Sequence, residues 1–235
     1  MKYKINSLLI KISKFLTYLR FTIQTNIGVL KDYQPHPFIE SSHNKLKRDC
    51  YDRLSEINNI LPLDREDYSY LDIGCHTGFF LFKLVNNKRG FGLGIDHGIT
   101  EIMTAKQIAD SYDYKNVNFM NYEINPHNIN SLPNFDVVIF LSVFHHFVRY
   151  YGKENALDIL NSIAEKTKKY LIFETGQPNE KSSWAKKLDF MGKDYNEWIK
   201  NKLIELNFKE IYYDKEFSTS VSEIKRTLFI AKKNF

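Results

Sequence analysis

The chain has 235 residues, of which 43% are hydrophobic and 26% are charged, a balance typical of a folded globular protein and unlike that of a disordered one. This length suits one α/β domain with an additional segment. The two cysteines, Cys50 and Cys75, share no metal-ligand spacing. They therefore indicate neither a disulfide framework nor a zinc site, no metal is expected, and a reducing cytoplasm is the simplest compartment.

Basic residues are concentrated at the N-terminus. Residues 1–31 hold six basic residues and no acid, and the remainder holds 27 basic and 28 acidic residues, so the net charge of +5 divides into +6 and −1. Apolar residues recur in this segment at steps of three and four, which places them on one face of a helix. They are Ile5, Leu8, Leu9, Ile12, Leu16, Leu19 and Ile23. Lys11 and Lys14 interrupt the apolar run too early for a signal peptide or a membrane span.

Two interpretations of this N-terminal helix stay open. In the first, it covers the core or the active site. In the second, it lies at a membrane surface, with its apolar face in lipid and its lysines on anionic head groups. The second interpretation would make the protein peripheral at the inner face of the membrane through residues 1–31.

The elements that follow alternate between helix and strand. Two prolines in residues 34–37 predict a boundary, and a helix is expected over residues 42–60. Strands are then expected at residues 68–73, 90–95, 117–121, 135–141 and 170–173, and helices at 78–86, 100–112, 153–168 and 197–206. This alternation predicts a parallel sheet covered on both faces. Strand-like residues 208–213 and 226–231 lie too close together for a helical crossover and predict an antiparallel hairpin.

The expected fold is therefore α/β, with a helical N-terminal extension before a mostly parallel sheet that ends in an antiparallel hairpin. This arrangement resembles the Rossmann-like, seven-stranded sheet of class I methyltransferases. On that division, residues 1–65 form the extension or cap and residues 66–235 form the methyltransferase domain.

The turn after the first expected strand reads Asp72-Ile-Gly74-Cys75-His76-Thr-Gly78. Glycines at such a turn let the backbone approach a nucleoside closely, and the position after a strand is where α/β sheets bind one. The turn resembles motif I of class I methyltransferases, usually D/E-x-G-x-G-x-G, with His76 in place of the middle glycine. Histidine reaches positive φ more readily than most residues.

Two acids follow the next strands. Asp96 ends the second strand, beside His97, where a carboxylate can accept hydrogen bonds from both ribose hydroxyls of a nucleoside. NAD-binding folds use the same geometry, so this acid does not identify the cofactor. Glu123 follows the third strand, and the resemblance implies a contact with adenine there, with an exposed loop acid as the alternative.

The fourth strand, Asp136-Val-Val-Ile-Phe-Leu-Ser142, leads into His145 and His146. It resembles the F-D-V-V strand and H-H turn of many small-molecule and glycan methyltransferases. The carboxyl ends of parallel strands hold the site in open α/β sheets, so these residues should border the methyl group and its acceptor. One histidine is expected to face the site and the other to pack, because neighbours in extended chain point in opposite directions. For a hydroxyl acceptor the facing histidine can act as general base, and a turn-forming or packed histidine is the alternative.

Two further features belong to the same edge of the sheet. Glu174 ends the fifth strand, where an acid can orient a hydroxyl or a histidine. The loop from Gln177 to Asp194, with Trp184 and Phe190, is long for a connection between elements and is interpreted as a lid over the acceptor.

The resemblance covers roughly residues 66–235 and implies an enzyme that uses S-adenosyl-L-methionine. It implies cofactor contacts at Asp72, Gly74, Cys75, His76, Gly78, Asp96, His97, Glu123 and Ser142, and catalytic roles for His145, His146 and Glu174. The leading hypothesis is O-methylation of a small molecule or of a sugar unit in a surface glycan. The alternatives are an RNA (tRNA) methyltransferase and an NAD-dependent oxidoreductase or non-catalytic nucleoside-binding module. The slightly acidic catalytic portion argues against a nucleic-acid partner.

Overall fold

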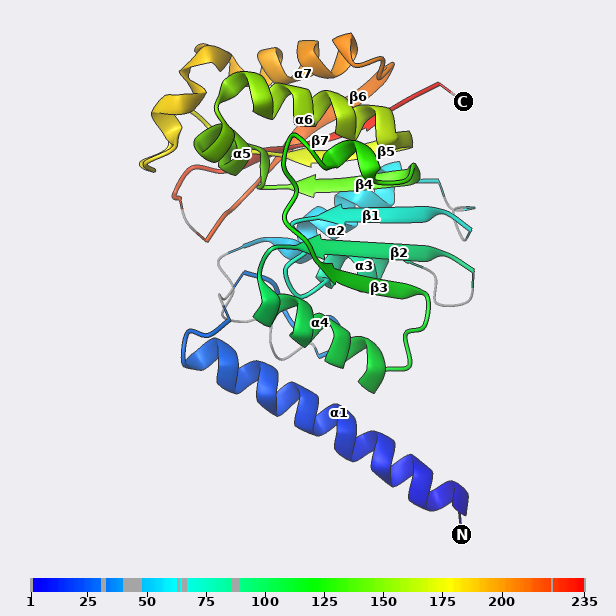
Figure 1. The fold of residues 1–235 in the computed structure, drawn as a ribbon. Coiled ribbons are helices and arrows are strands. Elements are labelled where there is room, and N and C mark those ends of the chain that lie inside the picture. The colour runs from blue at the N-terminus through cyan, green and yellow to red at the C-terminus, as the bar shows by residue number, and fades with distance from the viewer. Residues whose placement is uncertain are drawn as a thin grey trace.

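The computed structural model describes residues 2–30, 33–39, 48–62, 64, 67–85, 89–220 and 222–234, with no side-chain description for residues 2–7. Its centre is a seven-stranded sheet with the strand order β3-β2-β1-β4-β5-β7-β6 (Figure 1). The strands are β1 (Ser69–Ile73), β2 (Phe91–Asp96), β3 (Val117–Asn121), β4 (Phe135–Leu141), β5 (Thr167–Glu174), β6 (Glu210–Phe217) and β7 (Arg226–Lys232).

The first five strands pair in parallel, and β7 runs antiparallel to both β5 and β6. This confirms the expected mostly parallel sheet with a C-terminal antiparallel hairpin. Strand order reverses between β1 and β4, and ligands of open α/β sheets bind at such a switch point.

Helices cover both faces of the sheet, because alternate residues of each central strand point to opposite sides. Val138 and Phe140 of β4 join one apolar core, and Val137 and Ile139 join the other. The first core is covered by α5 (Phe144–Tyr151), α6 (Lys153–Lys166), α7 (Tyr195–Glu205) and the 3₁₀ helix η3 (Ala185–Met191). The second is covered by α1 (Lys2–Asn26), α2 (Cys50–Ile60), α3 (Phe79–Leu84) and α4 (Ile99–Ser111). A short 3₁₀ helix, η2 (Ile129–Ser131), precedes β4.

Three local expectations differ from the structure. Helix α5 was not expected, because the His145-His146 pair was interpreted as a turn. Helix α3 ends at Leu84 rather than at residue 86, which lies outside the described residues, as do residues 42–47 of the expected second helix. The proline-containing segment 34–37 is a break after α1, but it is buried against the domain and is no exposed linker.

Candidate functional site

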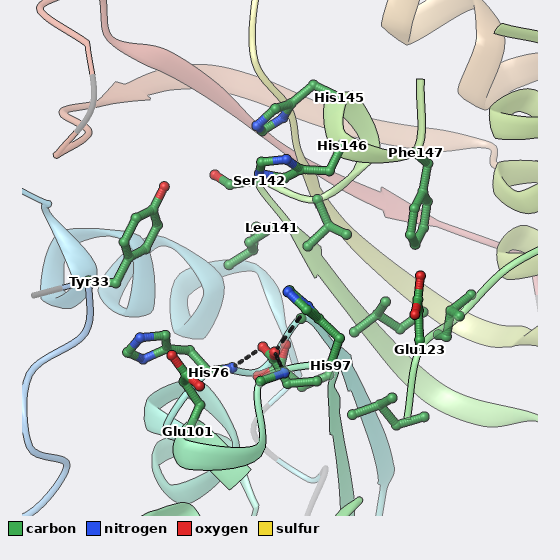
Figure 2. Close-up of a pocket in the computed structure, with 18 of the residues that line it drawn as sticks. Tyr33, His76, His97, Glu101, Glu123, Leu141, Ser142, His145, His146 and Phe147 are labelled. Carbon is green, nitrogen blue, oxygen red and sulfur yellow. Dashed lines mark hydrogen bonds and ion pairs between the residues drawn. The ribbon is translucent and has the colours of Figure 1, made fainter. Parts of the chain in front are cut away.

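A cavity of about 750 Å³ opens at the carboxyl ends of β1, β2, β3 and β4 (Figure 2). Its walls come from the turns after these strands, from the N-terminal residues 33, 34 and 48, and from residues 182–184 of the loop after β5. Seven of the nine expected cofactor residues line it, namely Asp72, Gly74, His76, Asp96, His97, Glu123 and Ser142. Cys75 and Gly78 are not among the residues lining the cavity, and of the expected catalytic residues His145 and His146 line it but Glu174 does not.

The turn after β1 has the backbone that its sequence predicts. Gly74 has φ +75°, and a Cβ there would overlap the side chain of Val143. Gly78 has φ +82°, and a Cβ there would overlap the ring of Phe119. His76 takes the left-handed conformation with φ 52°, so the turn survives without the middle glycine. Its backbone N–H donates to Asp96 at 2.9 Å.

Cys75 serves the core rather than the cavity. Its thiol is buried in the apolar core on the α3 side of the sheet, and its backbone N–H donates to Ile95. Burial raises the pKa of this thiol well above its ordinary value. Gly78 likewise acts indirectly, since it brings the start of α3 close to Phe119. Both residues lie outside the cavity lining, and their expected cofactor contacts stay predictions.

Asp96 is held at the cavity wall by two backbone donors. Its Oδ2 accepts from the N–H of His76, and its Oδ1 accepts from the N–H of Gly98 at 2.8 Å. A carboxylate offers about four lone-pair sites, so two remain for a pair of ligand hydroxyls. His97 lies beside it with Nδ1 3.4 Å from Oδ1, and its side chain is largely exposed.

Asp72 is a buried carboxyl group on the cavity floor. Its Oδ2 has no hydrogen-bond partner within the described part of the chain. Burial, with a further contribution from the nearby charge of Asp96, raises its pKa from 3.8 to about 8. A cation placed in the cavity beside this group would stabilise its ionised form and lower the pKa again.

Glu123 lies at the opposite side of the cavity, at the loop after β3. Its carboxylate accepts a hydrogen bond from the Tyr151 hydroxyl at 2.9 Å, and its side chain is exposed. Tyr122 and Ile124 beside it also line the cavity. The loop therefore offers both a polar acceptor and apolar walls at the place where the resemblance implies adenine.

The two histidines begin helix α5 and both line the cavity, their ring centroids 4.3 Å apart. The expectation that only one would face the site assumed extended chain, whereas neighbours in a helix are about 100° apart. His145 is the packed one: it is buried against Trp184, 4.3 Å between ring centroids, and its Nδ1 accepts from the N–H of Gly176 at 3.0 Å. Burial lowers the pKa of His145 well below its ordinary value. His146 is partly exposed.

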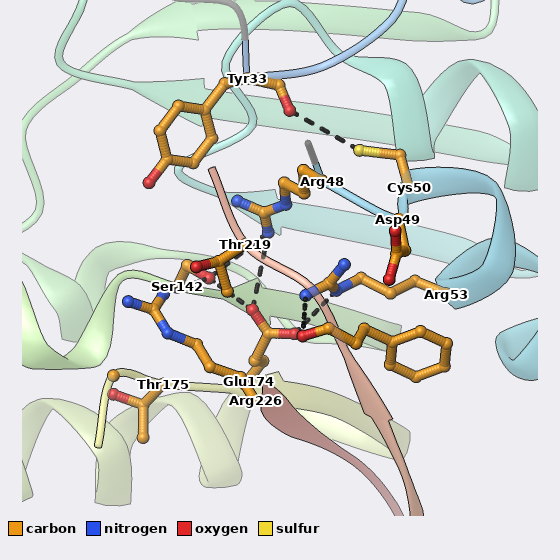
Figure 3. A network of polar contacts seen from close by, with 12 residues as sticks. Tyr33, Arg48, Asp49, Cys50, Arg53, Ser142, Glu174, Thr175, Thr219 and Arg226 are labelled. Atoms are coloured by element: carbon orange, nitrogen blue, oxygen red, sulfur yellow. Dashed lines mark hydrogen bonds and ion pairs between the residues drawn. The ribbon is translucent and has the colours of Figure 1, made fainter. Parts of the chain in front are cut away.

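Glu174 lies behind the cavity in a buried polar network (Figure 3). Its carboxylate accepts from Arg53 Nε at 2.7 Å and from the hydroxyl of Ser142 at 2.6 Å. Despite its burial, Arg53 and Arg48 hold the pKa of Glu174 below its ordinary value. The hydroxyl that Glu174 orients is thus that of Ser142, so it holds the end of β4 in place and has no direct contact with the cavity.

Ser142 shows why this network matters for the site. It has the left-handed φ of 61°, unusual for a residue other than glycine, and its N–H donates to the backbone oxygen of Glu174 at 2.7 Å. Its hydroxyl also accepts from Arg226 at 3.1 Å. The hydroxyl of Ser142, a residue that lines the cavity, is thus already engaged by Glu174 and Arg226.

The N-terminal segment supplies site residues that the sequence did not single out. Tyr33, Gln34 and Arg48 line the cavity. The side-chain oxygen of Gln34 accepts from the N–H of Phe79 at 3.1 Å, at the first turn of α3. The only sequence signal was the irregular segment around the two prolines, which was interpreted as a boundary.

Only part of the loop after β5 lines the cavity. Ser182, Ser183 and Trp184 line the cavity. Phe190, by contrast, packs on Trp198 of α7, with 5.2 Å between ring centroids. That the loop covers an acceptor stays a prediction, supported by residues 182–184 alone.

The sequence matches a family model described as "Methyltransferase domain" over residues 64–215. The chain belongs to this methyltransferase family. Together with the sheet order, this makes it a class I methyltransferase, an assignment that implies S-adenosylmethionine as the methyl donor. No curated protein matches the methyltransferase by sequence.

Solved structures share the fold of this methyltransferase. A crystal structure of WbdD, a bifunctional kinase-methyltransferase, is 24% identical, with a TM-score of 0.70 over 88% of this chain and 46% of that one. The magnesium protoporphyrin IX methyltransferase ChlM from Synechocystis PCC 6803, solved with bound SAM, is 19% identical, with a TM-score of 0.52 over 77% of this chain and 74% of that one. This chain spans about half the length of the WbdD chains it matches.

Proposed function

We propose that this methyltransferase moves the methyl group of S-adenosylmethionine to a hydroxyl of a small molecule or of a sugar unit in a surface glycan. The observation that carries the proposal is the division of one cavity into two halves. The turns after β1, β2 and β3 bring Asp72, Gly74, Asp96 and Glu123 to the cavity, groups that suit a nucleoside and an amino acid, and the start of α5 and the loop after β5 bring His146 and Trp184.

The donor half fits the chemical groups of S-adenosylmethionine. Asp96 has acceptor positions for the two ribose hydroxyls, and Glu123 with its neighbours borders the adenine position. Asp72 lines the cavity with a buried oxygen that has no partner among the described residues and that an ammonium group would satisfy. These residues would hold the cofactor, which supplies a methyl group activated by a positively charged sulfur.

The acceptor half is bordered by His146, Trp184 and Tyr33. Aromatic side chains combine a large apolar face with a polar tip, which suits an acceptor that carries both CH groups and hydroxyls. His146 is partly exposed in the cavity, and histidine can take up a proton near neutral pH. We assign the general base to His146, because the Nδ1 of His145 already accepts the Gly176 N–H and burial lowers the pKa of that ring.

In this scheme the protein acts mainly by alignment. The two halves of the cavity hold donor and acceptor at short range, and orientation of this kind can contribute about 7–11 kcal/mol to a bimolecular reaction. Trp184 adds an apolar ring to the wall beside His145. His146 takes the hydroxyl proton as the oxygen attacks.

The donor assignment is tested by calorimetry of the purified protein with S-adenosylmethionine, S-adenosylhomocysteine and NAD. We expect binding of the first two only. Binding of NAD alone would overturn the donor proposal.

The base assignment is tested by comparing turnover of His146→Ala and His145→Ala. Loss of a general base costs about 10²–10⁴-fold in rate, so we expect a loss in that range for His146→Ala with little change in cofactor affinity. His145→Ala should instead lower stability, because it removes the packing against Trp184. Unchanged turnover in His146→Ala would contradict the base role.

The acceptor class is tested by following labelled methyl groups into glycan, lipid and RNA fractions. The proposal expects label in glycan or in small molecules. Label in RNA alone would favour the alternative of RNA modification. The structure gives that alternative no added support, since the basic residues within 8–30 lie on α1, which contributes no residue to the cavity wall in the described chain.

A further inference from the structure

Arg48 is a buried guanidinium that lines the cavity and lies beside Glu174 and Tyr33 (Figure 3). Its side chain is only 4% exposed. The face of the Tyr33 ring lies 5.0 Å from its central carbon. Tyr33 lines the cavity as well, so the two residues form one wall.

The other two arginines of the network have carboxylate partners at short distance. Arg53 donates to Glu174 at 2.7 Å, and Arg226 makes two hydrogen bonds of 2.8 Å to Glu180. Asp49, on the Arg53 side of Figure 3, accepts the N–H of Ser218. Glu180 and Asp49 are therefore engaged by other groups, and the shortest contact of Glu174 with an arginine is to Arg53.

Among the described residues, no carboxylate lies as close to Arg48. Its nearest carboxylate oxygen, of Glu174, is 3.8 Å away, and its contact with the Ser142 hydroxyl is long at 3.4 Å. Its Nε has no hydrogen-bond partner within the described residues. A buried guanidinium is costly unless it is paired and hydrogen-bonded, and it is best matched by a planar or multidentate anion.

We propose that Arg48, stacked on Tyr33, binds a carboxylate or phosphate group of a ligand in this cavity. The anion has two possible sources. The first is the carboxylate at the amino-acid end of the cofactor, whose ammonium group would then face Asp72. The second is an anionic group on the acceptor, which would narrow the acceptor to acidic molecules. The chemistry of the contact is the same in both cases, and only the assignment of its source rests on the proposed function.

Three probes separate the sources in the full-length protein. S-adenosylhomocysteine carries the amino-acid end, 5′-methylthioadenosine lacks it, and inorganic phosphate is a free anion. Calorimetry gives the two nucleoside affinities, and the thermal midpoint with and without phosphate reports anion binding. The variants are Arg48→Gln and Arg48→Lys, with Arg20→Gln as the control, since Arg20 is exposed on α1 outside the cavity.

If the anion is the cofactor carboxylate, we expect Arg48→Gln to lower the affinity for S-adenosylhomocysteine at least about tenfold. The affinity for 5′-methylthioadenosine should not change. Arg48→Lys should recover part of this loss. If the anion belongs to the acceptor, both nucleosides keep their affinity and phosphate stabilises the wild type but not Arg48→Gln.

The inference would be overturned if wild type and Arg48→Gln bound each of the three probes equally well. It would also be overturned if Arg48→Gln lost the same factor of affinity for both nucleosides. These outcomes differ from failure of the donor proposal, in which the wild type itself binds no S-adenosylhomocysteine. In that case the phosphate measurement still decides the role of Arg48.

A second, independent observation concerns the surface of α1. One face of this helix packs on α4: the Thr17 hydroxyl is 2.6 Å from that of Ser111, and Lys14 lies over the ring of Tyr112 at 4.7 Å. The other face carries apolar side chains that are 42–62% exposed, namely Leu8, Leu9, Ile12, Phe15, Leu16, Leu19 and Ile23. Figure 1 shows α1 along the outer side of α4, with its N-terminal end extending beyond the rest of the domain.

Seven exposed apolar side chains on one face of a helix form a continuous apolar stripe, and such a stripe on a protein surface indicates an interaction site. Residues 1–31 carry six basic residues and no acid, so the charge around the stripe suits an anionic partner. On a helical wheel, Lys11 and Arg20 flank the stripe on its two sides. Among the described residues no helix has the length and hydropathy to cross a bilayer, so the helix would lie in the interface.

We infer that α1 lies on an anionic lipid surface, with its exposed apolar face among the acyl chains and its basic residues at the head groups. The test is sedimentation of the full chain with phosphatidylglycerol-containing and with purely phosphatidylcholine vesicles. The variant combines Leu9→Gln, Leu16→Gln and Ile23→Gln, which are exposed and therefore leave the packing on α4 intact. Ile204→Gln, an equally exposed apolar residue on α7, is the matched control.

We expect the wild type and the control to sediment with anionic vesicles, less so at high salt, and the triple variant to stay in the supernatant. Equal partitioning of all three would overturn the inference. A dimer of the wild type that the triple variant cannot form, without any vesicle binding, would assign the face to a second copy of the chain and would also overturn it.

Discussion

Asp72 and Glu174 are two buried carboxyl groups at the carboxyl ends of β1 and β5, and their pKa values move in opposite directions. Burial raises the pKa of Asp72 to about 8, whereas Arg53 and Arg48 lower that of Glu174 in spite of its burial. The difference lies in their partners. Glu174 meets an arginine at 2.7 Å, and Asp72 has an oxygen with no partner among the described residues.

This contrast assigns a structural role to Glu174 and a ligand-binding role to Asp72. A buried carboxylate that already has its cation contributes to structure, here by fixing the end of β4 through Ser142. A buried carboxyl group without one raises the energy of its own ionised form until a cation arrives. The four predictions below test the contrast, from the largest expected effect to the smallest.

The largest effect is expected for Glu174→Gln. This change leaves Arg53 buried without a counter-charge, and breaking a buried ion pair costs about 3–5 kcal/mol. Denaturant unfolding should show the loss. The control is Glu197→Gln, which removes a partly exposed ion pair with Lys200 worth about 0–1 kcal/mol. If Glu174→Gln lowered the free energy of unfolding no more than Glu197→Gln does, Glu174 would have no structural role.

The second prediction concerns ligand binding by Asp72. If its carboxylate meets the ammonium group of the donor, binding of S-adenosylhomocysteine requires the ionised form. The affinity should then fall by up to about tenfold for each pH unit below about 8. Asp72→Asn should bind weakly with no such slope. Calorimetry from pH 6 to 9 measures both, and parallel profiles for the two proteins would contradict the contact.

The third prediction concerns the protein without ligand. Because the folded pKa of Asp72 lies above its ordinary value, its stabilising contribution is full below about pH 4 and is lost as the pH rises to about 8. Asp72→Asn removes this loss, so the variant should gain on the wild type in thermal midpoint as the pH is raised. A constant difference between the two across this range would show that Asp72 ionises freely in the folded protein.

The smallest effect is expected for His76→Gly, which restores the glycine usual at this position of the family motif. The turn already has φ 52°, and its contact with Asp96 comes from the backbone. We therefore expect stability within about 1 kcal/mol of the wild type and an unchanged affinity for S-adenosylhomocysteine, measured by calorimetry. A large loss of affinity would assign a ligand contact to the imidazole.

The sequence alone was sufficient for the sheet and for much of the donor half. Residues 117–121 and 135–141 were expected as strands with the bounds that the structure gives them, because short apolar runs between turns carry a strong local signal. The turn around Gly74 and the acid at Asp96 were also placed, since both depend on the few residues next to a strand end.

The sequence was less informative where contacts join distant segments. Helix α5 was missed because the residues from Phe144 to Tyr151 begin directly after a turn and lack the usual start signal, with no side-chain cap at Val143. The interpretation of the two histidines changed with it.

What the sequence by itself determined was the order of the elements and the residues at strand ends, which are set by local propensity and periodicity. Only the tertiary structure decided the roles of Arg48, Tyr33 and Glu174. Their roles depend on which charges meet across separations of about a hundred residues in the chain: Arg53 pairs with Glu174 at a separation of 121. Burial makes the free energy of a paired or an unpaired charge large. Glu174, which is paired, therefore stabilises the fold, whereas Asp72 is placed to bind a cationic group of a ligand.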